Sequence, residues 1–182
     1  MSSLVSVWRA EHRAFGALLA LLEQQLELFR KGEAPNYEMM LDVVDYMVDY
    51  ADRFHHPGED IVFAKLAERV PAAVSSVQEL TREHSEILRS GRELTSGLEG
   101  VMHGAVTLRS TIEAQAKRYL DTFRRHMYAE EQGLFLAALE HLSKEDWTSV
   151  EREAKRGEDP LLGERPEQRY SALRREISGR SG

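Results

Sequence analysis

The chain has 182 residues, of which 42% are apolar and 30% charged, and its net charge is -7 at pH 7. This length and composition suit one domain with an extension, and the acidic balance disfavours nucleic acid as the main partner. The lack of cysteine excludes disulfides, thiolate catalysis, zinc–thiolate sites and iron–sulfur clusters.

The N-terminal sequence has neither a charged leading region nor a long apolar segment. No apolar run approaches the roughly 18 residues of a membrane-spanning helix. We therefore expect a cytoplasmic protein without a membrane partner.

Apolar residues recur at three- and four-residue spacing along the chain, which predicts amphipathic helices and no strands. The predicted helices run from Leu4 to about Arg30, from Asn36 to about Val70, from Pro71 to about Leu98, and from about Thr107 to Leu142. Asn36 is a candidate N-cap, Pro57 predicts a kink, and Gly97, Gly100 and Gly104 predict a loose connection. Short turns between successive helices favour an all-α, up-down-up-down four-helix bundle over residues 1–142.

Residues 143–182 are expected to form a helical C-terminal extension. Ser143 and Asp146 belong to a predicted capping box that opens a short helix from Glu145 to about Arg156. A second, highly charged helix is predicted over 167–177. We assign this extension no chemistry, and we find no internal repeat in the chain that is long enough to matter.

The second predicted helix carries two adjacent histidines and two adjacent carboxylates, His55, His56, Glu59 and Asp60. Because residues four apart share a face of a helix, His55 and Glu59 can point in one direction. A histidine that binds one metal, with a carboxylate one turn away that bridges to a second, is a pattern suited to two-metal sites.

Each of the other three predicted helices has a histidine on its apolar stripe: His12, His84 and His126. Counting from the turns places all of them near the height of His55, although His126 is out of step by about five residues, or roughly 7 Å. The glycine-rich connection or a later helix start, near Thr111, would absorb that difference. His126 and Glu130 repeat the four-residue spacing.

A lone histidine on an apolar face is usually a core residue with a hydrogen-bond partner, and we interpret His103 and His141 in that way. Burying five imidazoles and two carboxylates without a metal would be costly, so the layer of histidines predicts a metal centre. Imidazole and carboxylate ligands suit iron, with manganese or zinc as possible substitutes. A ferritin-like centre is disfavoured, because no histidine has Glu three positions before it.

The order His, His-x-x-x-Glu, His, His-x-x-x-Glu over about residues 5–142 resembles the hemerythrin-like, or HHE cation-binding, family. The resemblance implies a bundle that holds two iron ions with an oxo or hydroxo bridge. It implies the following ligands: His12 and His55 on one iron, His84 and His126 on the other, and Glu59 and Glu130 bridging.

Two departures from the pattern of oxygen-carrying hemerythrins bear on function. Leu88 occupies the position of a further histidine, and His56 is the expected replacement ligand. Oxygen-carrying hemerythrins have an Asp five residues after the histidine of the fourth helix, whereas this chain has Glu130 four residues after His126. Glu131 occupies the fifth position and is expected to face solvent or the outer side of a ligand. Both departures count against simple reversible oxygen carriage.

Several neighbouring residues have two open interpretations. Asp52 and Asp60 could each accept the outer N–H of a ligand histidine, or could be solvated charges. A set of apolar side chains could form a dry wall around the centre or be ordinary core: Trp8, Phe15, Phe63, Leu88, Tyr119 and Phe123.

The function expected from these residues is binding of oxygen, nitric oxide or a related small ligand, for sensing, storage or oxidative and nitrosative protection. The alternatives are a peroxide-decomposing or oxidase-type di-iron enzyme, and an iron sensor. The expected partner is a small diatomic or peroxide ligand, with a homodimer left open.

Overall fold

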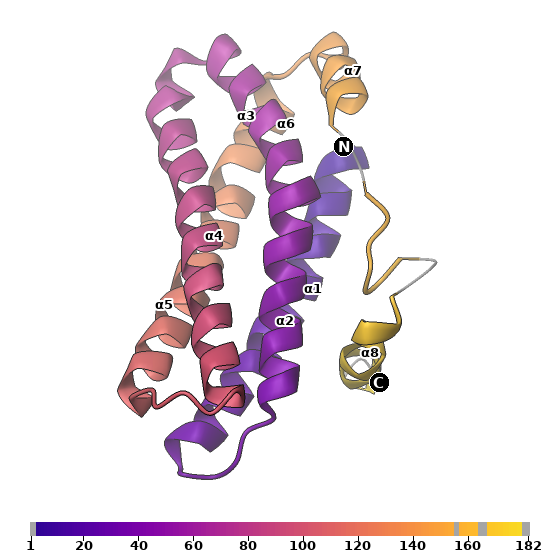
Figure 1. Ribbon diagram of the computed structural model, residues 1–182. Helices are drawn as coiled ribbons and strands as arrows, with labels where there is room; N and C mark the ends of the chain where they lie inside the picture. The colour runs from indigo at the N-terminus through magenta and orange to yellow at the C-terminus, as the bar shows by residue number, and fades with distance from the viewer. Residues whose placement is uncertain (1–2, 155–156, 164–166, 180–182) are drawn as a thin grey trace.

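The computed structural model describes residues 3–154, 157–163 and 167–179, and these form helices and connecting turns without strands (Figure 1). The bundle consists of α1 (Ser3–Arg30), α2 (Tyr37–Tyr50), η1 (Ala51–His55), α3 (His56–Arg69), η2 (Pro71–Ala73), α4 (Val74–Met102), α5 (Arg109–Ala129), η3 (Glu130–Leu134) and α6 (Phe135–His141). The chain continues through α7 (Lys144–Glu153), η4 (Gln168–Tyr170) and α8 (Ser171–Gly179). The all-helical prediction is confirmed.

The core consists of two apolar clusters with a polar layer between them. One cluster, which includes Phe15, Ile87 and Phe123, extends toward the turn between α1 and α2. The other, which includes Trp8 and Leu80, extends toward the turn between α3 and α4. Along each long helix the predicted ligand histidine lies at the change from one cluster to the other, so the fold holds the histidines at one height.

The second predicted helix begins as expected, because the Asn36 side chain accepts a hydrogen bond from the Met39 amide. It is not a single α-helix with a kink at Pro57. A π-helical turn, η1, comes immediately before α3, and the His56 amide bonds to the Ala51 carbonyl, five residues back. Proline lacks an amide and crowds the preceding turn, so a widened turn just before Pro57 relieves both problems.

A second π-helical turn, η3, interrupts the fourth predicted helix, where the Phe135 amide bonds to the Glu130 carbonyl. The sequence pattern did not predict this turn. The third predicted helix was expected to end near Leu98, but α4 continues to Met102. A Cβ on Gly97 would come within 2.8 Å of Ile112, so this glycine permits close helix packing and does not begin a loop.

The C-terminal helices lie on the bundle. α7 contacts α3, where Arg69 forms an ion pair of 2.7 Å with Asp146, and the predicted capping box of Ser143 and Asp146 is present. The predicted end of this helix, Arg156, lies outside the described residues. α8 contacts α2 and buries Leu173 in the first apolar cluster. None of the described helices is long and apolar enough to cross a membrane.

Candidate metal centre

The structure brings together all the side chains predicted to bind metal. Their ligand atoms form three overlapping groups, in each of which all atoms lie within 4.8 Å of one another. The groups are His12, His55 and Glu59; Glu59, His84, His126 and Glu130; and His56, His84 and His126. Every member is buried, and both glutamates are 0% exposed.

Glu59 turns one oxygen toward each pair of histidines. Its Oε1 lies 3.4 Å from His12 Nε2 and 3.2 Å from His55 Nε2. Its Oε2 lies 3.8 Å from His84 Nε2. A carboxylate divided in this way can bind one ion through each oxygen.

Glu130 divides its oxygens in the same manner from the opposite side. Its Oε2 lies 3.4 Å from His12 Nε2, whereas its Oε1 lies 3.5 Å from His84 Nε2 and 3.1 Å from His126 Nε2. The two glutamates therefore face two half-sites. We call these the His12 half-site, with His12 and His55, and the His84 half-site, with His84 and His126.

The outer nitrogens of the histidines in the His12 half-site bind carboxylates. His12 Nδ1 lies 3.0 Å from Glu131, and His55 Nδ1 lies 2.6 Å from Glu11. A neutral imidazole that donates from Nδ1 keeps its lone pair on Nε2. The two Nε2 atoms are only 3.1 Å apart, so both inner nitrogens are directed into the same small volume.

The His84 half-site repeats this arrangement. His126 Nδ1 lies 3.1 Å from Glu83 Oε2. His84 Nδ1 lies 3.1 Å from Asp60 Oδ1, although less well aligned than a regular hydrogen bond. Carboxylates behind ligand imidazoles fix the ring orientation and the tautomer, and they raise the basicity of the ligand.

Most of these outer carboxylates are themselves held in place. Each contact is a side-chain hydrogen bond: Tyr50 to Glu11 at 3.0 Å, Thr81 to Asp60 at 3.1 Å, and Arg125 to Glu83 at 3.2 Å. The network fixes the carboxylates and, through them, the imidazoles.

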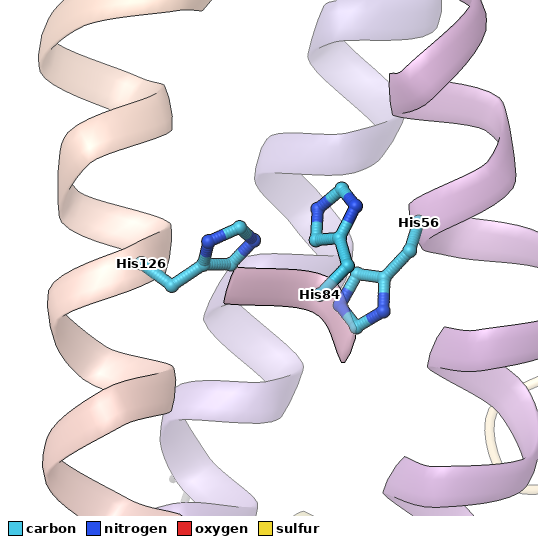
Figure 2. A group of neighbouring side chains, drawn as sticks. All are labelled: His56, His84 and His126. Carbon is cyan, nitrogen blue, oxygen red and sulfur yellow. The ribbon is translucent and has the colours of Figure 1, made fainter. Parts of the chain in front are cut away.

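His56 belongs to the His84 half-site. Its ring stacks on that of His84 with centroids 4.2 Å apart, and its centroid lies 5.7 Å from that of His126. The three rings point toward one another from separate helices (Figure 2). Both ring nitrogens of His56 are buried without a hydrogen-bond partner, whereas the outer nitrogen of each other site histidine lies within 3.1 Å of a carboxylate oxygen.

The buried charges shift one another's pKa values strongly. Burial disfavours the charged form of His55, but Glu59 and Glu11 outweigh it and raise the pKa of His55 to about 10. Burial acts against ionised Glu59 as well, yet His55 and His12 lower the pKa of this carboxyl well below its usual value. Burial, and then the neighbouring imidazoles, lower the pKa of His56 well below its usual value.

The remaining unpaired atoms suit a metal. Buried and without a hydrogen bond are both oxygens of Glu59 and of Glu130, both nitrogens of His56, and Nε2 of His84 and of His126. Leaving buried polar and charged atoms unpaired costs several kcal/mol each by order of magnitude. Imidazole nitrogens and carboxylate oxygens are ligands for divalent first-row metals, so this donor set fits a metal site.

Comparison with known protein families agrees with this geometry. The family described as the Hemerythrin HHE cation binding domain matches residues 3–138. The chain belongs to this hemerythrin family. Searches of curated proteins and of solved structures found no match. Membership implies cation binding, and the buried histidine and glutamate groups are the place in the chain that fits it.

The outer carboxylates of this hemerythrin domain were only partly anticipated. Asp60 and Glu131 do face ligand imidazoles, but Asp60 pairs with His84 and not with its helical neighbour His56. Asp52 is wrong as an imidazole partner, since it lines a surface groove. Glu11 and Glu83 were missed, and the available signal was that each directly precedes a ligand histidine.

The centre also shows a short repeat of its ligand pattern. In each half, a Glu-His pair on one helix is followed by a His-x-x-x-Glu motif with an acidic residue after it. The Glu of the pair binds the later histidine across a separation of 44 residues in the first half and 43 in the second. His56 has Met127 as its counterpart, so it is the residue that makes the halves differ.

Aromatic rings border the polar layer. The distance between ring centroids is 4.9 Å for Phe15 and His55 and 6.0 Å for Phe123 and His56. Phe135, which was not anticipated, stacks on His12 with centroids 5.6 Å apart. Leu88 instead lines a surface groove. His103 is exposed and His141 is 44% exposed, and neither joins the site.

Proposed function

We propose that this hemerythrin-family protein holds two iron ions between Glu59 and Glu130, in an up-down-up-down four-helix bundle. We propose that it binds oxygen, nitric oxide or a related small ligand there, for sensing, storage or oxidative and nitrosative protection. The observation that carries the proposal is the division of each glutamate's two oxygens between the two half-sites. Nitrogen and oxygen donors without thiolate suit iron, and manganese or zinc could substitute.

The two half-sites offer different numbers of protein ligands. The His84 half-site gains a third imidazole from His56, whereas the described residues supply the His12 half-site with two. We propose that the small ligand binds at the His12 half-site, where a coordination position remains open. In this proposal His56 replaces the histidine that oxygen-carrying hemerythrins have at the position of Leu88.

The residues of the chain prepare the centre for such a ligand. Bound iron would supply an open coordination position and electrons for a redox-active ligand. The outer carboxylates hold the imidazoles in one tautomer, and the rings of Phe15 and Phe135 exclude water from the histidines beside them.

Metal analysis together with an ultraviolet–visible spectrum tests this proposal. We expect about two iron atoms per chain, a new band on adding azide, and a charge-transfer band when the reduced protein meets oxygen or nitric oxide without other oxidants. The Glu130→Ala variant should lose iron and both bands, while Glu79→Ala, altered at an exposed glutamate, should keep them. An iron-loaded protein whose spectrum stays silent with every ligand would contradict the proposal.

A peroxide-decomposing enzyme is a second candidate, because a hydrogen-bonded chain from His55 through Glu11 to Tyr50 could carry protons to and from the centre. Steady-state peroxide disproportionation by the iron-loaded protein tests it. We expect turnover that disappears in Glu130→Ala, and equal rates for both proteins would rule the enzyme out.

A further inference from the structure

Tyr50 is connected to the candidate metal centre through a single carboxylate. Its hydroxyl donates to Glu11 Oε1 at 3.0 Å, and Glu11 Oε2 accepts a hydrogen bond from His55 Nδ1 at 2.6 Å. The phenol is 5% exposed. An oxidisable ring and a predicted metal ligand thus share the two oxygens of one side chain.

Tyr46 extends this connection away from the centre. Its ring stacks on that of Tyr50, with centroids 5.6 Å apart and an interplanar angle of 6°. Its hydroxyl donates to Asp159 Oδ2 at 3.1 Å. Asp159 lies half-buried in the segment between α7 and α8, so the pair of rings leads from His55 to the edge of the molecule.

Both phenols have a carboxylate that can accept a proton. A tyrosine that gives up one electron becomes a strong acid, so a nearby base makes its oxidation easier. Tyr119 provides the contrast, because it is fully buried and its hydroxyl has no hydrogen-bond partner among the described residues. Burial raises the pKa of Tyr119, and burial together with Asp159 raises the pKa of Tyr46. The hydroxyls of Tyr119 and Tyr46 therefore keep their protons until the rings are oxidised.

We propose that Tyr50, with Tyr46 behind it, donates electrons to the centre and so carries oxidising equivalents away from it. This inference rests on the proposed iron centre. Hydrogen peroxide takes up two electrons and two protons and leaves as two waters. Tyr50 supplies one electron and passes its phenolic proton to Glu11, which leaves a neutral tyrosyl radical. A bound centre with one ferrous and one ferric ion would supply the other electron, and solvent supplies the two protons.

Tyr46 then restores Tyr50. It gives one electron to the Tyr50 radical and its own proton to Asp159, while Tyr50 recovers a proton from Glu11. The radical thereby moves to the buried ring of Tyr46, whose hydroxyl contacts the half-buried Asp159. Repeated oxidation would leave chemical damage at these two rings and not at the imidazoles of the centre.

Electron paramagnetic resonance tests the proposal. The iron-loaded protein, reduced to one ferrous and one ferric ion per centre, is mixed with one equivalent of hydrogen peroxide and frozen within milliseconds, with ring-deuterated tyrosine in a parallel sample. We expect a radical signal whose hyperfine splitting collapses on deuteration. The signal should be lost in Tyr50→Phe, persist longer in Tyr46→Phe, and be unchanged in Tyr119→Phe. Peptide mass spectrometry should find oxidised Tyr46 and Tyr50.

The azide spectrum separates the possible failures. An intact azide band with no tyrosyl signal, or with equal signals in Tyr50→Phe and the parent protein, would overturn the electron-donor proposal alone. A signal with the same lifetime in Tyr46→Phe as in the parent protein would overturn transfer between the two rings. Absence of both iron and the azide band would overturn the proposed iron centre and the electron donors together.

Discussion

At the scale of single residues, the outer carboxylates determine how well the imidazoles can bind metal. Glu83 receives a hydrogen bond from His126 at 3.1 Å and is held by Arg125. The bond to His126, ahead of all other causes, lowers the pKa of Glu83. Its charge is therefore coupled directly to the ligand.

Replacing Glu83 with Gln should weaken metal binding by about 10- to 100-fold, because the amide orients His126 but no longer supplies a negative charge. Competition titration against a chelator of known affinity measures the change. Glu79→Gln, altered at an exposed carboxylate one turn earlier on α4, is the matched control and should bind like the parent protein. Equal affinities for Glu83→Gln and Glu79→Gln would show that the outer carboxylate has no effect.

The raised pKa values of two histidines predict how the stability of the metal-free protein depends on pH. The pKa of His55 is raised to about 10 and that of His84 to about 9, in both cases because carboxylates outweigh the effect of burial. A histidine whose pKa is higher in the folded than in the unfolded protein stabilises the folded state. This stabilisation is complete below the unfolded pKa of about 6.5 and is lost as the pH rises through the folded pKa. The melting temperature should therefore fall between pH 7 and about 10.

Thermal denaturation followed by circular dichroism checks this expectation. The His55→Ala variant should show a flatter profile over the same interval, since the titrating group is gone. His103→Ala, altered at an exposed histidine, should show the parent slope. A melting temperature that rises with pH in the metal-free parent would be the opposite of the expected sign.

Much of the candidate site could be predicted at this scale. The spacing of His55 to Glu59 and of His126 to Glu130 is visible in the sequence, and so is one histidine on each remaining long helix. The outer partners were harder, because Glu11 reaches His55 across 44 residues and its target depends on how the helices pack. The interpretation in which Asp52 accepts an imidazole N–H was wrong for the same reason.

At the scale of elements, the two π-helical turns are the least predictable feature. Each adds a residue to a helical turn without changing the apolar period enough to be read from the sequence. Pro57 was a visible signal for η1, whereas η3 has no comparable residue. The helix bounds themselves were mostly recoverable, because Asn36 and Ser143 cap their helices as their sequences indicate.

Pro57→Ala should weaken the His84 half-site. Alanine restores the missing amide and removes the crowding ring, so a regular α-helix becomes favourable over 51–55. Removing the widened turn would rotate His56 by about 100° relative to the residues before it, away from His84. Iron content and the azide spectrum measure the effect, with an expected loss of about half of the bound iron.

Pro71→Ala is the matched control for this prediction, because Pro71 begins η2, away from the polar layer. It should leave the iron content and the azide band unchanged. Full iron occupancy in Pro57→Ala would show that the π turn persists without proline or that His56 is not a ligand.

At the scale of the whole molecule, the metal should stabilise the fold. The predicted ligands come from all four long segments of the bundle, so a bound ion connects helices that also pack through the two apolar clusters. Binding to the folded state alone adds about 2.7 kcal/mol when the free metal is at a hundredfold excess over its Kd. An iron sensor would use this difference.

Chelation should therefore lower the melting temperature of the iron-loaded protein, and added iron should restore it. Differential scanning calorimetry at fixed pH measures both changes. The Glu130→Ala variant should melt at one temperature with or without chelator. An unchanged melting temperature for the parent protein after complete iron removal would exclude sensing through folding.

Because each glutamate faces both half-sites, it determines how the effects of two substitutions at the centre combine. A histidine such as His55 faces one half-site, but Glu59 offers an oxygen to both, 3.2 Å from His55 and 3.8 Å from His84. Losing an imidazole should disable one ion and leave the other, whereas losing either carboxylate should disable the pair. Substitutions at Glu59 and Glu130 should therefore be strongly epistatic, the second adding little to the first, and selection would act on the centre as one inherited unit.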